Sequence, residues 1–383
     1  SRDLIDLMRA IAALHVVLAH TLLGIARFSD PVDVPDFVAR MPGWLNIGWQ
    51  TLPVDLFFLV TGLLIGTGLI AEHAKSGTID FGRYARRRAV RIVPLYWLAV
   101  VFYAVLEQHG PADVLRSLVF MGYTLADENV VPVGWTIEVL FLAYALFPLA
   151  VVGLCRSARP WAWMSLALAV SLAVRLALVL PSETAFKGLM PDLTVFGDTP
   201  DTLFELYYRP WQRFGPFVVG LMLAWALRRG APRPGRRAEV LGWAGLLAAV
   251  WMLWLPLHNP AWLPHEVWSE TVWRLIWVAE PAVFSGAVAL ALYPALARGL
   301  GGLPGARAWR PLAAEIYGLY LFHLPLMLLA AILVLQSTEA ADLAGATTLQ
   351  VLLIWALASA ATWLVARGLT RWVDRPLAAR FGT

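Results

Sequence analysis

Hydrophobic residues recur along this chain in runs of around twenty, separated by shorter polar stretches. A membrane-spanning helix needs about 20 consecutive apolar residues, so the pattern predicts ten transmembrane helices. The expected ranges are 4–26, 47–71, 92–108, 134–155, 161–181, 209–228, 239–257, 272–297, 312–335 and 347–370. The predicted fold class is therefore all-α, a polytopic membrane helical bundle that forms one integral-membrane domain over residues 1–383.

The polar connections between these runs alternate sharply in charge. One set holds 20 Lys and Arg residues: 73–91, 153–160, 228–237, 297–311 and 367–383. The other set holds 4: 27–46, 109–133, 182–208, 258–271 and 336–346. Cytoplasmic loops are enriched in Lys and Arg, so the alternation predicts that both termini lie in the cytoplasm. An odd number of spans would break it.

Composition excludes a soluble protein and several kinds of site. Of the 383 residues, 60% are hydrophobic and 15% charged, and the mean hydropathy is +0.67. The single cysteine, Cys155, excludes an internal disulfide and a cysteine-based metal site. In a soluble chain a pI near 9.4 would suggest nucleic acid. Here the basic residues separate hydrophobic segments, so topology explains them and no nucleic-acid partner is expected.

The first hydrophobic segment carries charge where a membrane helix should carry none. No small-x-small cleavage site follows it, so a retained helix is expected rather than a removed signal peptide. Arg9 and His20 are eleven residues apart, which places them within about 20° on one helix face and roughly 16 Å apart along the axis. Ala13 and Val16 lie on the seam between them. Ionisable groups at membrane depth usually face the bundle interior and are functional, although a snorkelling Arg and an interhelical hydrogen-bonding His are the structural alternatives.

Five arginines precede and enter the third hydrophobic run. They are Arg83, Arg86, Arg87, Arg88 and Arg91. Spacings of three and four residues would gather several guanidinium groups on one side of a helix, and Arg suits bidentate phosphate binding. The cluster therefore predicts a phosphate-bearing cytoplasmic ligand. A purely topological role beside anionic lipid headgroups is the alternative.

Polar residues in the other spans lie mostly toward the predicted outer side. They are Asp55, Glu138, Arg209, Arg213, Glu280 and, near mid-depth, His323. The outer connections 27–46 and 182–208 are long, acidic, aromatic and rich in proline. Aromatic faces and carboxylates together suit sugar binding, and an interfacial aromatic belt is the alternative. No Walker loop, G-x-S-x-G, H-E-x-x-H, haem or zinc spacing occurs in the sequence.

Six stretches, in order along most of the chain, resemble the acyltransferase 3 family, the integral-membrane O-acyltransferases that modify bacterial surface and periplasmic carbohydrates. They are IDLMRAIAALHVVLAH, VDLFFLVTGLLIG, RRRAVRIVPLYW, VGWTIEVLFLAYALFP, RPWQRFGPFVVG and YGLYLFHLP. The first contains the Arg-x10-His pair of Arg9 and His20. Two positions depart from the usual pattern, since Thr61 stands where Ser is usual and Asp374 where Glu often precedes Pro.

The resemblance implies a cytoplasmic acyl-CoA co-substrate, no metal, and a carbohydrate hydroxyl as acceptor outside the bacterial inner membrane. Acyl-CoA phosphates would bind Arg83, Arg86, Arg87, Arg88 and Arg91. The pantetheine arm would follow the seam from Arg9 to His20, with His20 as general base on the hydroxyl. Asp55 or Glu138 would orient His20 or hold the sugar, and Arg9 would bind the donor. Arg209 or Arg213 would stabilise an oxyanion or an anionic acyl group. Further substrate contacts are expected from Asp6, Tyr317 and His323.

Several alternatives stay open at this stage. A covalent acyl intermediate on His20 is one. The acyl group is acetyl or succinyl, and the acceptor is a polysaccharide, a periplasmic glucan or a lipid-linked sugar. A transporter or flippase for a carbohydrate or anionic lipid would use similar intramembrane charges, although no internal repeat favours it. A non-catalytic scaffold is disfavoured by the number of ionisable residues inside spans. Membrane lipid is a further expected partner, and the oligomeric state is left open.

Overall fold

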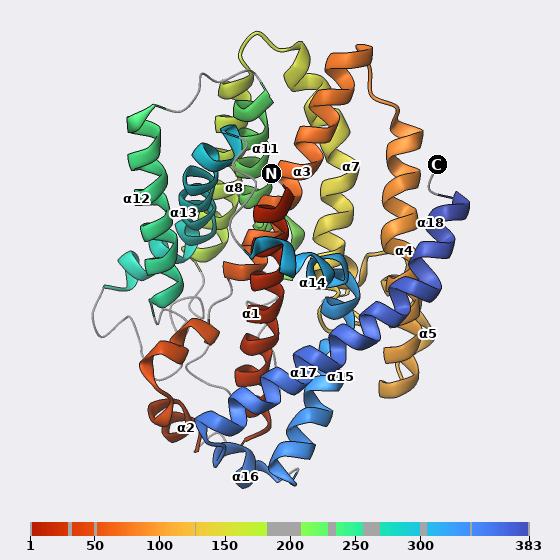
Figure 1. The fold of residues 1–383 in the computed structure, drawn as a ribbon, viewed down its shortest axis with the longest axis vertical. Coiled ribbons are helices and arrows are strands. Elements are labelled where there is room, and N and C mark those ends of the chain that lie inside the picture. Colours follow the sequence, from red (N-terminus) through yellow and green to blue (C-terminus); the bar gives the residue numbers. More distant parts are fainter. Residues whose placement is uncertain are drawn as a thin grey trace.

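The structure is a computed structural model of a helical bundle (Figure 1). It describes residues 2–29, 33–49, 52–126, 128–181, 208–228, 235–255, 269–298, 305–337 and 339–381. Of these described residues, 87% are helical and none lies in a β-strand. The all-α prediction is therefore confirmed.

Among the described residues, eight helices are long and apolar enough to cross a membrane. They are α1 (Arg2–Phe28), α3 (Leu52–Ser76), α4 (Phe81–Glu107), α7 (Trp135–Arg156), α8 (Pro160–Val179), α13 (Glu270–Ala297), α15 (Ile316–Leu335) and α17 (Thr348–Leu369). The other two predicted ranges hold the shorter apolar helix α11 (Phe214–Arg228) and the 19-residue helix α12 (Arg236–Trp254), which is not among the eight. A polytopic membrane bundle is confirmed, while ten crossings and cytoplasmic termini stay predictions.

Short helices fill the described connections. They are α2 (Val34–Arg40), η1 (Gly43–Trp49), α5 (Pro111–Leu118), α6 (Gly122–Leu125), η4 (Pro210–Gln212), η6 (Ala306–Trp309), α14 (Arg310–Ala314), α16 (Ala340–Ala344), the π-helical turn η7 (Thr370–Asp374) and α18 (Arg375–Phe381). The second span was expected from residue 47, but the 3₁₀ helix η1 occupies its first residues and α3 begins at Leu52. Most of the outer connection 182–208, predicted to bind sugar, lies outside the described residues.

Helix α4 begins eleven residues before the predicted third span, so the arginine stretch is helical. Asp80 caps this helix, because its side chain accepts a hydrogen bond of 2.9 Å from the backbone N–H of Arg83. That bond holds the pKa of Asp80 below its usual value. All five arginines therefore lie on the first three turns of one continuous helix.

Helix α1 lies near the centre of the molecule and packs against α3, α15 and α17 (Figure 1). On the far side of α3, the helix α11 comes unusually close. A Cβ atom on Gly62 would lie 2.4 Å from the carbonyl oxygen of Phe217, and one on Gly220 would lie 2.2 Å from that of Leu59. The two backbones thus touch at glycines, as helices often do in membranes, where small residues permit close packing.

A buried arginine contacts α13 where a proline interrupts its backbone hydrogen bonds. Pro281 has no N–H, so the carbonyl of Trp277 four residues earlier has no intrahelical partner. The guanidinium of Arg175 on α8 donates to this carbonyl at 2.7 Å, to that of Val278 at 3.1 Å and to that of Gln212 at 2.9 Å. Arg175 therefore joins α8, α13 and η4 through backbone oxygens, one of which lies four residues before Pro281.

A similar arrangement shapes α15 beside a buried histidine. Pro325 frees the carbonyl of Leu321, which accepts a hydrogen bond of 3.1 Å from the hydroxyl of Tyr103 on α4. His323 lies between Leu321 and Pro325 in sequence and is completely buried. The hydroxyl of Tyr103 thus holds the segment of α15 that carries His323.

Candidate functional site

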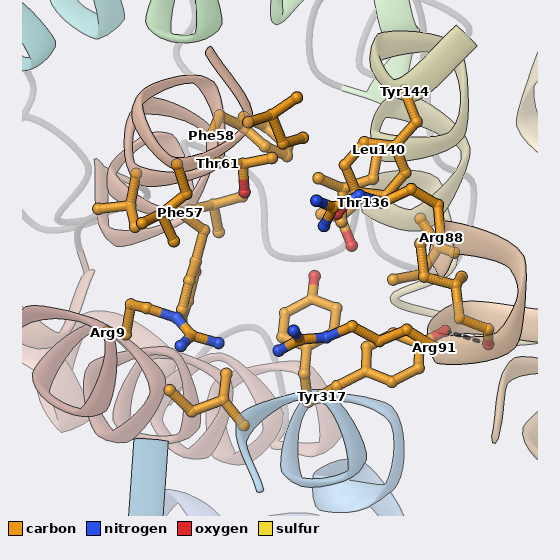
Figure 2. Close-up of a pocket in the computed structure, with 18 of the residues that line it drawn as sticks. Arg9, Phe57, Phe58, Thr61, Arg88, Arg91, Thr136, Leu140, Tyr144 and Tyr317 are labelled. Atoms are coloured by element: carbon orange, nitrogen blue, oxygen red, sulfur yellow. Dashed lines mark hydrogen bonds between the residues drawn. The ribbon is translucent and has the colours of Figure 1, made fainter. Parts of the chain in front are cut away.

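A cavity of about 530 Å³ opens between α1, α3, α4, α7 and α15 (Figure 2). Its size is in the range of small-molecule and cofactor sites. Most of its wall is aliphatic or aromatic, and its polar lining residues are Asp6, Arg9, Thr61, Arg88, Arg91, Thr136, Tyr144, Tyr317 and Tyr320. A mainly apolar wall with a few convergent polar groups is typical of a ligand site.

Three arginines bring positive charge to this cavity. Figure 2 shows the guanidinium groups of Arg9, Arg88 and Arg91 pointing into the same space from two sides. Arg9 forms an ion pair of 3.5 Å with Asp6, one turn earlier on α1. Arg88 lies over the ring of Tyr144, with its central carbon 5.4 Å from the ring centroid. The arrangement suits an anion such as a phosphate, which guanidinium groups bind through paired hydrogen bonds.

The five-arginine cluster is divided by its helix. Arg88 and Arg91, three residues apart, line the cavity. Arg83, Arg86 and Arg87 are exposed and are not among the lining residues. The predicted phosphate site thus contains two members of the cluster together with Arg9, and the other three do not line the cavity.

Two histidines from distant parts of the chain meet inside the bundle. The rings of His20 on α1 and His323 on α15 have centroids 4.8 Å apart and are roughly edge to face. His20 Nδ1 lies 2.9 Å from the carbonyl oxygen of Val16, and His323 Nδ1 lies 2.7 Å from that of Tyr320. A carbonyl oxygen only accepts, so in each neutral ring Nδ1 carries the hydrogen and Nε2 keeps the lone pair. The buried Nε2 of His323 has no hydrogen-bond partner among the described residues.

Tyr320 lies between the cavity and the histidine pair. It lines the cavity, and its ring centroid is 5.8 Å from that of His323. One turn earlier on α15, Tyr317 also lines the cavity and donates a hydrogen bond of 2.9 Å to the carbonyl of Ile92. The cavity therefore extends from the three arginines to the vicinity of the histidines.

The seam on α1 is arranged differently from the sequence prediction. Ala13 and Val16 are almost completely buried in the hydrophobic core and are not among the cavity residues. The space beyond Arg9 is instead bounded by α3, α7 and α15. Apart from Ile5, Asp6 and Arg9, the residues that line this space therefore come from other helices and not from the predicted face of α1.

Asp55 pairs with Arg213 in a second polar cluster. Arg213 Nη1 lies 3.2 Å and 3.3 Å from the two carboxylate oxygens, and both side chains are buried. The guanidinium also lies over the ring of Trp135, 5.4 Å from its centroid. Glu280 and Arg175 interact electrostatically with the pair. Asp55 and Arg213 thus form a buried ion pair. Among the described residues, no hydrogen bond joins Asp55 to His20.

Glu138 organises the segment that precedes α7. Its carboxylate accepts hydrogen bonds from the backbone N–H groups of Tyr123 and Thr124, from the Thr124 hydroxyl and from the Asn129 amide, at 2.7–3.1 Å. Arg209 donates to the carbonyls of Tyr123 and Thr124 at 2.5 Å and 3.1 Å. Burial raises the pKa of Tyr123 well above its usual value, so its hydroxyl stays protonated and donates to the carbonyl of Pro132. Among the described residues, all hydrogen bonds of the Glu138 side chain go to this segment.

Sequence reasoning did not select Arg175, Asn129 or Tyr320. For Arg175 a signal was present, because an arginine in the middle of the fifth hydrophobic run is an intramembrane charge. Asn129 lies in a connection and Tyr320 resembles any aromatic core residue, so neither gave a comparable signal. Within the described parts of the chain, no group of three or more His, Cys, Asp or Glu residues could hold a metal ion, and metal-free chemistry stays a prediction.

Comparison with known proteins gives one match. A family model described as an acyltransferase domain matches residues 2–367. No curated protein and no solved structure matches the chain.

Proposed function

The chain belongs to the acyltransferase 3 family, and from that membership we propose that it transfers an acyl group from cytoplasmic acyl-CoA to a hydroxyl of an extracytoplasmic carbohydrate. The family membership and the apolar helices make it a multi-pass membrane acyltransferase. The donor, the acceptor, the catalytic base and the bacterial inner membrane are parts of the proposal.

The convergence of Arg9, Arg88 and Arg91 on one cavity carries the proposal. By the positive-inside rule, the start of α1 and the start of α4 lie on the cytoplasmic side, where acyl-CoA is made. The phosphates of CoA would bind the three guanidinium groups. Its uncharged arm would lie against the apolar wall and direct the thioester toward Tyr320 and the histidines.

His20 is proposed as the general base. Its Nε2 lone pair takes the proton of the acceptor hydroxyl as the oxygen attacks the thioester carbonyl carbon, and the same proton is then given to the departing CoA sulfur. The bond formed is C–O, the bond broken is C–S, and the products are the ester and CoA thiol. The carbonyl of Val16 fixes the ring of His20, so no carboxylate is needed to orient it. A covalent acyl intermediate on His20 stays the alternative.

The remaining candidates keep narrower roles. Asp55 and Arg213 neutralise each other and are proposed to shape the region above the histidines. Glu138 and Arg209 are proposed to hold the segment at residues 122–131 in place near the acceptor. Polysaccharide, periplasmic glucan and lipid-linked sugar are all acceptors compatible with this arrangement.

The test is release of CoA and formation of acylated carbohydrate by purified protein in lipid nanodiscs supplied with labelled acyl-CoA. His20→Ala should lower turnover about 100-fold or more, as expected for loss of a general base, and should leave acyl-CoA binding intact. His15→Ala is the matched control, because His15 is a second, buried histidine on α1 and should affect turnover much less. Full activity of His20→Ala would contradict the proposed base. Movement of labelled sugar across a membrane without acyl-CoA would instead identify a transporter.

A further inference from the structure

A second, smaller cavity lies on the other side of the histidine pair. It has a volume of about 190 Å³ and is bounded by α1, α15, α16 and α17. Its lining residues are Thr21, Gly24, Ile25, Met327, Leu328, Ala331, Ile332, Ser337, Leu343 and Ile354. None of these residues is charged. The Thr21 hydroxyl donates to the carbonyl of Val17 in its own helix, so the wall of this cavity is essentially apolar.

The second cavity begins one helical turn beyond the two histidines. Gly24 follows His20 by four residues and Met327 follows His323 by four, so each lies above its histidine on the same helix face. A Cβ atom on Gly24 would lie 2.8 Å from the Met327 methyl carbon. The absence of a side chain at Gly24 therefore lets Met327 occupy the space next to the histidine pair.

The order of the features along the bundle matches the order of the parts of one linear molecule. From the predicted cytoplasmic side come three arginines, the larger cavity, the histidine pair and then the apolar cavity. An acyl-CoA presents its phosphates, its uncharged arm, its thioester and its acyl tail in that order. Because the proposed base His20 would act on the thioester, the acyl tail would extend beyond the histidine rings.

We propose that the second cavity holds the hydrocarbon tail of the transferred acyl group, so that the donor is a CoA thioester whose acyl chain is uncharged and longer than acetyl. This inference rests on the proposed acyl-CoA-dependent function. An engineered apolar cavity of about 150 Å³ holds benzene, so the present volume accommodates a tail of up to about six carbons. The lining contains no cation to meet a second carboxylate, which disfavours succinyl.

The experiment measures displacement of labelled CoA from the purified protein in nanodiscs by free CoA and by acetyl-, butyryl-, hexanoyl- and succinyl-CoA. Burial of a methylene strengthens binding about fourfold, so affinity should rise by up to that factor for each carbon that enters the cavity. Hexanoyl-CoA should therefore bind at least tenfold more tightly than acetyl-CoA. Succinyl-CoA should bind no better than acetyl-CoA.

Two substitutions on α15 change the cavity in opposite directions. Ala331→Phe fills it and should remove the preference for butyryl and hexanoyl chains while leaving free CoA and acetyl-CoA binding unchanged. Met327→Ala enlarges it and should shift the optimum to a longer chain, which keeps the test decisive if the filled variant does not fold. Leu333→Ala is the control, because Leu333 lies on the same helix but is 66% exposed and outside the cavity.

The possible outcomes distinguish failure of the tail site from failure of the proposed acyl-CoA-dependent function. Binding of CoA with no dependence on chain length would overturn the tail site while leaving the donor site in place. Leu328 and Ile332 at the rim are exposed, so a chain-length dependence that both variants leave unchanged would assign the hydrocarbon to the surrounding bilayer and overturn the tail site. Failure of the wild-type protein to bind CoA or any acyl-CoA would overturn the proposed function itself.

Discussion

Replacing Arg88 while leaving its neighbour Arg87 intact tests whether the cavity, and not the general charge of α4, binds the donor. Arg88 lines the cavity, and its buried Nε has no hydrogen-bond partner among the described residues. Arg87 is exposed on the same helix, one residue away. The two residues contribute equally to the positive-inside charge, so Arg87→Gln is a matched control for topology.

The expected magnitude follows from the contacts that the guanidinium would make. A hydrogen bond to a charged group contributes about 1.5–3 kcal/mol, so losing one phosphate contact should raise the Kd for acyl-CoA about 10- to 100-fold in Arg88→Gln. Arg88→Lys should lose less, because it keeps the charge but not the planar fork. Arg87→Gln should change the Kd less than about threefold, the loss expected of an exposed charge.

The assay is equilibrium binding of labelled acyl-CoA to each purified variant in nanodiscs, with thermal unfolding measured on the same samples. The unfolding measurement is needed because Arg88 also contacts the rings of Tyr84 and Tyr144, and loss of those contacts lowers stability. Equal losses of affinity in Arg88→Gln and Arg87→Gln would show that diffuse charge attracts the donor. Unchanged affinity in a folded Arg88→Gln protein would place the donor site elsewhere.

Three further predictions concern the packing around the site. Gly220→Ala should lower the thermal unfolding temperature, because the new Cβ would lie 2.2 Å from a carbonyl oxygen. Gly153→Ala is the control: nothing lies within 4 Å of a Cβ there, so this variant should be neutral or stabilising by up to about 1 kcal/mol. Arg175→Met should cost about 1–3 kcal/mol of stability for each backbone carbonyl left unpaired, with the exposed Arg159→Met as a nearly neutral control in the same unfolding assay. Glu138→Gln should speed backbone hydrogen exchange over residues 122–131, since an amide group would face N–H donors; unchanged exchange with lost turnover would instead support a catalytic role.

The sequence was sufficient for the helices and insufficient for their contacts. All ten predicted ranges contain a helix, because long apolar runs in a membrane leave few alternatives to helical structure. Exact starts were harder to predict, as α4 shows: its cap, Asp80, lies outside the apolar run that marked the span. Likewise, a 3₁₀ helix replaced the expected first residues of the second span, where aromatic and glycine residues continue the hydrophobic pattern.

The candidate site was predictable in its residue types but only partly in its groupings. Spacing placed Arg88 and Arg91 on one helix face, yet only packing against α1 and α15 determines that this face borders a cavity. The meeting of His20 with His323 depends on two helices about 300 residues apart in sequence. The partners of Asp55 and Glu138 are equally non-local. The sequence therefore suggested catalytic roles for both carboxylates, whereas in the structure Asp55 pairs with Arg213 and Glu138 bonds to the segment before α7.

The anchoring of both histidine rings has a consequence for proton movement under the proposed function. Each Nδ1–H is bonded to a carbonyl of its own helix, so neither ring can turn over without breaking that bond. A proton accepted at Nε2 must therefore leave from Nε2, on the side from which it came. Transmembrane proton relays need groups that receive on one side and release on the other. Under the proposed function this pair would exchange protons locally, so acyl transfer at this site would not require a proton path across the membrane.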